Sequence, residues 1–412
     1  MAKLAGALRT HHKVITDGFF RSGDLDFQTR GALGRAVHGA SDPGDVLATI
    51  ARVRSPRDWF REWSTTAEQT ETVAAAAHKA GHRVSAAGAY LRAATYWAAA
   101  LDGVDSLGDP GPRLAPTFRR HRDCWDAFVD CSDGAHVRVS VPYEATSLPG
   151  YLLRPDASGT ARPTFVVTNG SDGSLSDLWG SGVAAALERG WNAFVFDGPG
   201  QQSMLFEHDV AFRPDWEAVL TPVLDVLVAR PDVDAGALTG YGISQGGYWL
   251  PRALAFEHRL RAAVVDPGVV DVSTSWLGRL PDSMVKQLDA GDREGFLKSM
   301  RVAERVPSLR RTLAFRGRPY RRDDMYDLFR TVCEYRLTSE QAGAVRTPLL
   351  VTDPEGEQFW PGQSRRLAGL VADAEVVAFA AADGAGGHCE PLARLRVEQR
   401  MFDWLADRLR TS

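Results

Sequence analysis

The sequence predicts an α/β fold: a mostly parallel central sheet covered by helices, with a helical N-terminal domain and a helical cap insertion. Three observations predict it. Alanine-rich segments with apolar residues at helical spacing fill the first part of the chain, short apolar runs alternate with helical segments after residue 136, and a charged helical stretch interrupts that alternation at residues 271–346. The composition, 44% hydrophobic and 24% charged, is that of an ordinary globular protein with a sizeable core.

The helical N-terminal domain is expected over residues 1–135. Its clearest segments are "TAEQTETVAAAAHKAG" and "SAAGAYLRAATYWAAALDG". The first part of the α/β core, residues 136–270, opens with "HVRVSVPYE" and "GYLLRPD", which predict an antiparallel hairpin. The runs "TFVVTNG", "NAFVFDGPG" and "GALTGYGIS" follow, with helical sequence between them, and this alternation predicts parallel strands.

The stretch 271–346 is too long for a simple connection within a compact domain, so it is interpreted as a helical cap inserted between two strands. The second part of the core, residues 347–412, contains "PLLVTDPEGE" and "AEVVAFAA" as strands. A glycine-rich loop and a long terminal helix follow them.

Several function classes are disfavoured by charge and cysteine usage. The net charge is -4 and no basic cluster is large, so nucleic acid is not an expected partner. The four cysteines form no Cys-x-x-Cys pair, which predicts neither a metal site nor a disulfide framework. No apolar run has the length of a signal peptide or a membrane span, so we expect a cytoplasmic protein that does not span a membrane. We also expect no cofactor.

The stretch "GYGISQGG" places Ser244 in a Gly-x-Ser-x-Gly pattern between a predicted strand and a predicted helix. A nucleophile elbow requires this strand, turn and helix, because the sharp turn exposes the serine hydroxyl. A serine needs a general base, and His388 lies on the loop after the last predicted strand, in "DGAGGHCEP". We therefore predict Ser244 as nucleophile and His388 as base.

The acid that orients the imidazole is expected on the loop after the preceding strand, in "PLLVTDPEGEQFWP". Glu357 is favoured by its distance from the strand. Asp353 is the main alternative, while Glu355 and the earlier Asp266 are weaker ones.

The tetrahedral oxyanion needs two backbone N–H donors. One is expected at Gln245, directly after the nucleophile. The second is expected on the loop "NGSDG", first at Ser171 and next at Gly170, with Asp172 bracing the loop.

Several of these motifs resemble those of a known protein family. "FDGPGQ", "GYGISQGG", "TPLLVTDPEGEQF", "GHCEP" and "SAAGAYLRAATYW" resemble the α/β-hydrolase branch that includes 2,6-dihydroxypseudooxynicotine hydrolase and the fungal yellowish-green pigment hydrolases. The resemblance implies the α/β-hydrolase fold, Ser244, Glu357 and His388 as the triad, a helical N-terminal domain over the site, and often a homodimer. The acid of that branch is commonly aspartate, whereas this chain reads "DPEGE", so Asp353 stays open as the alternative.

Members of that branch cleave carbon–carbon bonds next to a carbonyl, while relatives act on esters. The leading hypothesis is therefore hydrolysis of a carbon–carbon bond in an aryl ketone or polyketide-like β-dicarbonyl. A carboxylesterase or thioesterase, an acyltransferase or a peptidase on the same triad are alternatives, and a non-enzymatic binding module is disfavoured. Aromatic residues that could line an apolar pocket are Trp59, Trp63, Tyr90, Tyr96, Trp97, Trp276, Phe359 and Trp360.

Overall fold

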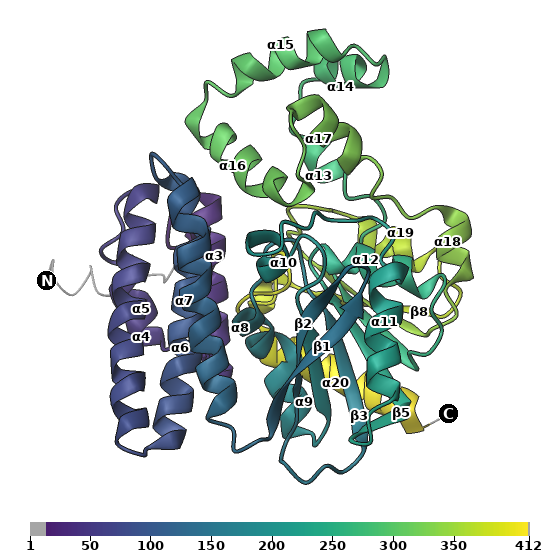
Figure 1. Cartoon of the computed structure of the whole chain (residues 1–412). Coiled ribbons are helices and arrows are strands. Elements are labelled where there is room, and N and C mark those ends of the chain that lie inside the picture. Colours follow the sequence, from purple (N-terminus) through teal and green to yellow (C-terminus); the bar gives the residue numbers. More distant parts are fainter. Residues whose placement is uncertain (1–13, 411–412) are drawn as a thin grey trace, which may run out of the picture.

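The computed structural model describes residues 14–410. A block of N-terminal helices stands beside an eight-stranded sheet flanked by helices, and a further group of helices projects over one end of the sheet (Figure 1). This arrangement confirms the predicted fold class.

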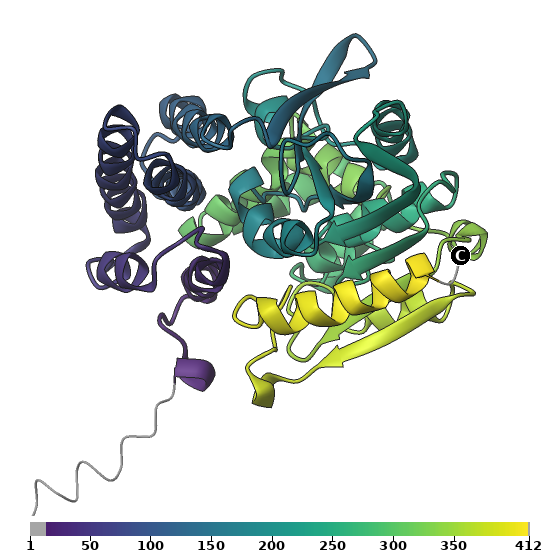
Figure 2. The same ribbon diagram turned by 90° about the horizontal axis from the view of Figure 1, so that it is seen from below.

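The N-terminal block is built around one alanine-rich helix. Its elements are α2 (Val14–Asp17), α3 (Gly23–Gly34), η1 (Arg35–His38), α4 (Pro43–Ile50), α5 (Pro56–Lys79), α6 (Arg83–Asp102), η2 (Val104–Ser106) and α7 (Gly111–Asp130). Helix α6 packs against both α5 and α7, because its alanines allow close approach. Larger rings fill the remaining space: Trp63 lies 5.6 Å from Trp59 and 5.5 Å from Tyr96, measured between ring centroids. Figure 2 views several of these helices nearly end-on.

The sheet has the strand order β1-β2-β4-β3-β5-β6-β7-β8. The strands are β1 (His136–Tyr143), β2 (Thr146–Leu153), β3 (Arg162–Thr168), β4 (Asn192–Phe196), β5 (Val233–Ile243), β6 (Ala262–Asp266), β7 (Leu349–Pro354) and β8 (Ala374–Phe379). Strands β1 and β2 form the antiparallel hairpin, β2 pairs antiparallel with β4, and the other pairs are parallel. The carboxyl ends of β3, β5, β6 and β7 therefore lie at one edge.

Successive side chains along a strand point to opposite faces of the sheet, so they belong to two separate cores. On β3, Val166 belongs to the core under α11 and α12, whereas Phe165 and Val167 belong to the core formed with α20 and the N-terminal helices. The helices around the sheet are α8 (Leu175–Leu178), η3 (Trp179–Val183), α9 (Ala184–Glu188), α10 (Gln202–Phe206), α11 (Glu217–Val228), α12 (Gly246–Leu254), α19 (Gln363–Ala368), η5 (Ala381–Asp383) and α20 (Arg394–Arg410).

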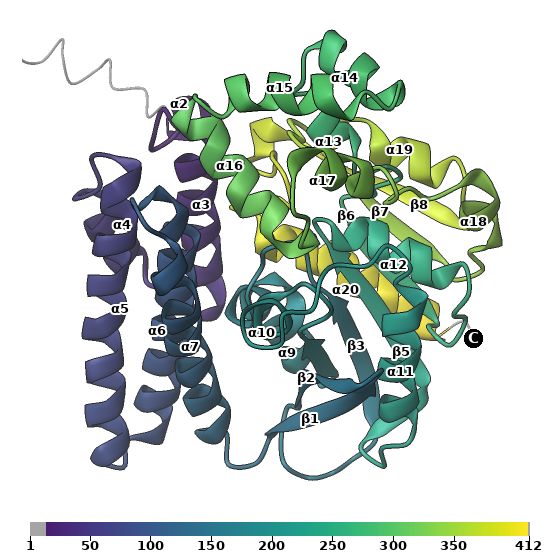
Figure 3. The same cartoon turned by 45° about the horizontal axis from the view of Figure 1, so that its top comes forward.

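The helices between β6 and β7 lie mostly above the sheet in Figure 3, and the last of them lies at its side next to β8. They are α13 (Thr274–Leu277), α14 (Asp282–Asp289), α15 (Arg293–Ala303), α16 (Pro307–Gly317), η4 (Arg318–Tyr320), α17 (Met325–Val332) and α18 (Ser339–Ala344). An ion pair between Arg318 and Asp105 joins this cap to the N-terminal helices. The division into domains at residues 135, 270 and 346 stays a prediction. Within residues 14–410, no helix is both long and apolar enough to cross a bilayer.

Candidate active site

Ser244 occupies a strained turn between β5 and α12. Its φ is 56°, in the left-handed region that side chains other than glycine rarely adopt. The neighbouring glycines make the turn feasible: a Cβ on Gly242 would lie 2.4 Å from the Gly246 carbonyl oxygen, and a Cβ on Gly246 would lie 2.3 Å from the Thr168 carbonyl oxygen. Only glycine at both positions lets β5, α12 and the end of β3 meet around the serine.

Ser244, His388 and Glu357 form one hydrogen-bonded chain. The His388 Nε2 lies 2.8 Å from the Ser244 Oγ, and the His388 Nδ1 lies 2.8 Å from the Glu357 Oε2. The other oxygen of Glu357 accepts hydrogen bonds from the backbone N–H groups of Phe359, at 2.7 Å, and Trp360, at 3.1 Å. The carboxylate thus holds the ring so that Nδ1 carries a proton and Nε2 faces the hydroxyl.

The electrostatics keep Glu357 ionised. Burial by itself raises the pKa of this carboxyl, but the charge and hydrogen bond of His388 and the two backbone donors outweigh burial, so its pKa lies below the usual value. An ionised carboxylate at this position stabilises the imidazolium that forms when His388 accepts a proton.

The competing carboxylates point elsewhere. Asp353 pairs with Arg365 at 2.7 Å, and the Glu355 Oε2 accepts the backbone N–H of Ala381 at 2.8 Å. Asp266 is buried and accepts a hydrogen bond from the Tyr241 hydroxyl at 2.7 Å. Of the four carboxylates considered from the sequence, Glu357 is the one that the structure brings to His388.

Of the three backbone amides expected to bind an oxyanion, two have no hydrogen-bond acceptor in the described structure and one has. The Gln245 and Ser171 amides donate to no acceptor among residues 14–410, whereas the Gly170 amide donates to its neighbour, the Asn169 Oδ1, at 2.7 Å. The loop passes directly over Ser244, because a Cβ on Gly170 would lie 2.8 Å from the Ser244 Cβ. Ser171 and Gln245 are therefore the two available donors, and Gly170 provides the close approach.

Gln201 braces this loop, a role that the sequence analysis missed. Its Nε2 donates to the carbonyl oxygens of Asn169, at 3.0 Å, and Gly170, at 2.8 Å, and its Oε1 accepts the Gly198 amide at 2.8 Å. The motif "FDGPGQ" indicates such a role, since it places a polar residue after a glycine turn at the end of β4, at the edge of the sheet where Ser244 also lies. The side chain of Asp172, expected to brace the loop, accepts only a 3.2 Å hydrogen bond from the Ser171 hydroxyl, while the Asp172 carbonyl oxygen accepts the Gln202 Nε2 at 3.1 Å.

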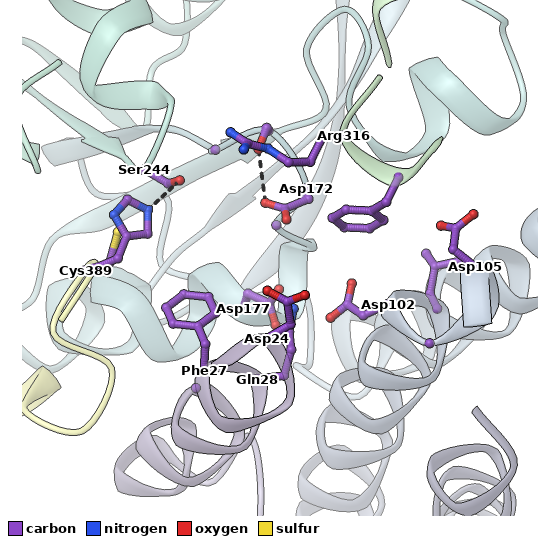
Figure 4. Close-up of a pocket in the computed structure, with 18 of the residues that line it drawn as sticks. Asp24, Phe27, Gln28, Asp102, Asp105, Asp172, Asp177, Ser244, Arg316 and Cys389 are labelled. Carbon is purple, nitrogen blue, oxygen red and sulfur yellow. Dashed lines mark hydrogen bonds between the residues drawn. The ribbon is translucent and has the colours of Figure 1, made fainter. Parts of the chain in front are cut away.

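A cavity of about 380 Å³ opens onto Ser244 and His388. Its walls come from α3, the end of α6, the loop after β3, the cap helix α16 and the His388 loop. Figure 4 shows Asp102, Asp172 and Arg316 in this cavity together with Ser244. Burial, reinforced by the charges of Asp172 and Asp177, raises the pKa of Asp102 well above its usual value, and burial likewise raises the pKa of Asp172.

The predicted aromatic residues divide into two groups. Trp59, Phe359 and Trp360 line the cavity. Trp63, Tyr90, Tyr96 and Trp97 pack within the N-terminal helices, and Trp276 lies in the cap. Phe27 also lines the cavity, with its ring 6.0 Å from the His388 ring, and no sequence pattern singles it out.

A second cavity of about 240 Å³ lies inside the cap. Most of its lining is apolar, including Trp276, Met284, Met300 and Leu313. We call it the cap chamber. It shares Arg279, Thr312 and Arg316 with the wall of the first cavity, so the two spaces adjoin. In the described part of the chain, no group of three or more His, Cys, Asp or Glu side chains is arranged to hold a metal ion.

Comparisons with known proteins agree with this fold. Hydrolase LUC6 of Fusarium sp is 30% identical over 357 residues, which cover 83% of this chain and 83% of that protein. The 20-hydroxy-prefusarin hydrolase FUS2 of Gibberella moniliformis is 31% identical over 280 residues, or 66% of this chain and 65% of that protein. The crystal structure of 2,6-dihydroxy-pseudo-oxynicotine hydrolase matches with a TM-score of 0.72 at 19% identity, over 91% of this chain and 95% of that one.

No family model matches the chain. The relatives and the shared architecture nonetheless define the class: the chain belongs to the α/β-hydrolase family that includes these fungal hydrolases. The resemblance inferred from the sequence motifs is thereby confirmed.

Proposed function

We propose that the protein is a cofactor-independent serine hydrolase in which Ser244 is the nucleophile, His388 the general base and Glu357 the acid that orients it. The observation that carries the proposal is the continuous chain of two 2.8 Å hydrogen bonds from Ser244 through His388 to Glu357, at a strained turn beside two free backbone amides. The backbone amides of Gln245 and Ser171 would receive the oxyanion.

We further propose that the preferred reaction is hydrolysis of a carbon–carbon bond next to a carbonyl. Ser244 attacks the carbonyl carbon while its proton passes to His388. The tetrahedral adduct then collapses by breaking the bond to the α-carbon, which leaves as a carbanion equivalent and takes the proton from His388. Water, deprotonated by His388, releases the acyl group as a carboxylic acid and restores Ser244.

The shape of the cavities supports a substrate with a carbonyl group and a larger apolar or aromatic part. Phe359 and Trp360 offer flat apolar walls beside His388, Trp59 also lines the cavity, and the adjoining cap chamber can take an apolar chain. The name of the relative FUS2, a 20-hydroxy-prefusarin hydrolase, is consistent with a secondary metabolite of this kind. Assembly as a homodimer and a cytoplasmic location belong to the same proposal.

Ester or thioester hydrolysis is the second candidate, because the same adduct expels an alkoxide or thiolate by the same steps. Transfer to an alcohol or amine acceptor, or peptide cleavage, would differ only in the group that attacks or leaves.

The test compares a p-nitrophenyl acyl ester with a 1,3-diketone that carries the same acyl group, using mass spectrometry and both wild-type protein and Ser244→Ala. Splitting of the diketone into acid and ketone, abolished by Ser244→Ala, supports carbon–carbon hydrolysis. Turnover of the ester alone makes the protein an esterase. If a fluorophosphonate fails to label Ser244 in folded protein and neither substrate reacts, the protein is a binding module and the proposed triad is refuted.

A further inference from the structure

Arg316, on the cap helix α16, presents its guanidinium to the cavity without a direct ion pair to any carboxylate among residues 14–410. It lines both the active-site cavity and the cap chamber. Its one hydrogen bond in the described structure runs from Nη2 to the Ser275 hydroxyl, at 3.0 Å, and no carboxylate among residues 14–410 forms an ion pair with it. A guanidinium has five N–H donors, so most of this donor capacity remains unused.

Two aromatic rings fix the position of this guanidinium. Its central carbon lies 4.9 Å from the centroid of the Trp276 ring and 5.6 Å from that of Phe359, which is cation–π range. Phe359 in turn contacts His388, with 4.7 Å between ring centroids. The arginine is thus held on the same aromatic wall that borders the catalytic imidazole.

Arg316 is half-buried, and its desolvation together with the nearby charge of Arg279 outweighs the attraction of Asp172 and Asp24 and lowers the pKa of Arg316 from its usual value. Asp172 attracts Arg316 electrostatically but forms no ion pair with it. The charge of His388, like that of Arg316, acts to lower the pKa of Asp172. Arg316 and His388 therefore both interact electrostatically with Asp172. Figure 4 shows Arg316 and Asp172 among the side chains that line the cavity. The unused N–H donors of Arg316 are suited to hydrogen bonds with an oxygen atom of the substrate.

The cavity is lined by charges of both signs. Asp24 and Asp172 face it, and so do Arg279, Arg311 and Arg316, so the lining as a whole selects neither a cationic nor an anionic substrate. A neutral substrate that acquires negative charge during the reaction would gain the interaction with Arg316 as the charge develops.

We propose that Arg316 binds the second oxygen of the substrate, a β-carbonyl or ring-ketone oxygen, and stabilises the enolate that forms when the carbon–carbon bond breaks. This inference rests on the proposed function. When the adduct on Ser244 collapses, the electron pair of the breaking bond moves through the α-carbon onto this oxygen. Arg316 donates hydrogen bonds to the resulting enolate, and the proton held by His388 then goes to the α-carbon, which gives the neutral ketone.

The test uses the matched ester and 1,3-diketone with Arg316→Gln, Arg316→Lys and the control Arg310→Gln, which changes an exposed arginine on the same helix. Loss of charged hydrogen bonds to the enolate is expected to lower kcat for the diketone by roughly 10- to 100-fold in Arg316→Gln. The ester, whose leaving group needs no electron sink, is expected to change by less than about threefold. Arg316→Lys should restore part of the diketone activity, and Arg310→Gln should match wild type.

A spectroscopic measurement separates this role from a merely structural one. In Ser244→Ala the diketone binds without cleavage, and ultraviolet absorption reports the fraction that has transferred the proton of its central carbon to His388 and become the enolate of the intact diketone. This fraction should rise on binding and fall in Ser244→Ala/Arg316→Gln, because Arg316 stabilises the same enolate oxygen. Equal losses for ester and diketone, or an unchanged enolate signal in the double variant, would overturn the inference. Diketone turnover that survives Ser244→Ala would instead overturn the proposed function. If Arg316→Gln does not fold, Arg316→Lys in both assays decides the matter.

Discussion

Gly170 and Ser244 lie so close that a single methyl group at residue 170 would collide with the serine side chain, since a Cβ there would be 2.8 Å from the Ser244 Cβ and 3.2 Å from its Oγ. Gly170→Ala must therefore displace either the serine or the oxyanion loop. We expect kcat to fall by about 100-fold, the scale of losing one oxyanion donor. Steady-state kinetics measure kcat, and the rate of fluorophosphonate labelling reports the reactivity of Ser244. Gly343→Ala, where the methyl group meets nothing within 4 Å, is the matched control.

Gln201 acts through the loop rather than on the substrate. Gln201→Glu replaces the Nε2 donor with an oxygen, which repels the carbonyl oxygens of Asn169 and Gly170. We expect kcat to fall by roughly 10- to 100-fold with a smaller change in KM, because the loop is needed most in the transition state. A change confined to KM would contradict this positioning role.

The two candidate acids can be separated by matched amide substitutions. Glu357→Gln removes the charge that faces His388 and permits the wrong imidazole tautomer, so kcat should fall by about 10⁴-fold, as for the corresponding change in a serine protease. Asp353→Asn breaks only the partly exposed pair with Arg365 and should leave kcat within about threefold. Steady-state kinetics on either substrate distinguish them, and the reverse ranking would assign the acid to Asp353.

A buried histidine ties the N-terminal helices to the C-terminal helix and should make this contact depend on pH. The His38 Nε2 lies 2.7 Å from the Glu398 Oε2. Burial lowers the pKa of His38, but the hydrogen bond and charge of Glu398 outweigh burial and raise it above the usual 6.5. Its contribution to stability is therefore complete below about pH 6.5 and is lost as the pH rises through the raised value.

Thermal unfolding of His38→Gln across pH 6 to 9 measures this contribution. The variant should be less stable than wild type by about 2 kcal/mol at pH 6, with a smaller difference at pH 9. The exposed His258→Gln should show no such trend. A difference that grows with pH would contradict the assignment.

Filling the cap chamber should change which substrates are accepted. Met300→Trp adds bulk to a buried position on the wall of this 240 Å³ space. We expect KM to rise about tenfold for an ester with a long acyl chain and to stay nearly constant for an acetyl ester, because only the long chain reaches the chamber. Equal effects on both esters would show that the chamber does not hold the chain.

The sequence predicted the parts of the site that depend on local geometry. A glycine pattern between a strand and a helix specifies the turn at Ser244, and loops after consecutive parallel strands meet at one edge, which brings His388 and Glu357 to the serine. It could not choose Glu357 over Asp353 with certainty, because that choice depends on which side chain the loop turns inward.

The walls of the cavity could not be predicted in the same way. Phe27, Asp102 and Arg316 come from helices in the N-terminal block and the cap, and their proximity to Ser244 depends on how these blocks pack against the sheet. No spacing in the sequence encodes that packing.

The separate origin of the triad and the walls has a consequence for how such a protein can change over evolution. The triad and the oxyanion loop are carried by the strand ends of the sheet, while much of the surface that a substrate would touch is carried by α3, α6 and α16. Substitutions on those three helices can alter substrate preference while the sheet keeps the reacting groups in register. New substrates could therefore be acquired one wall residue at a time, without passing through an inactive ancestor.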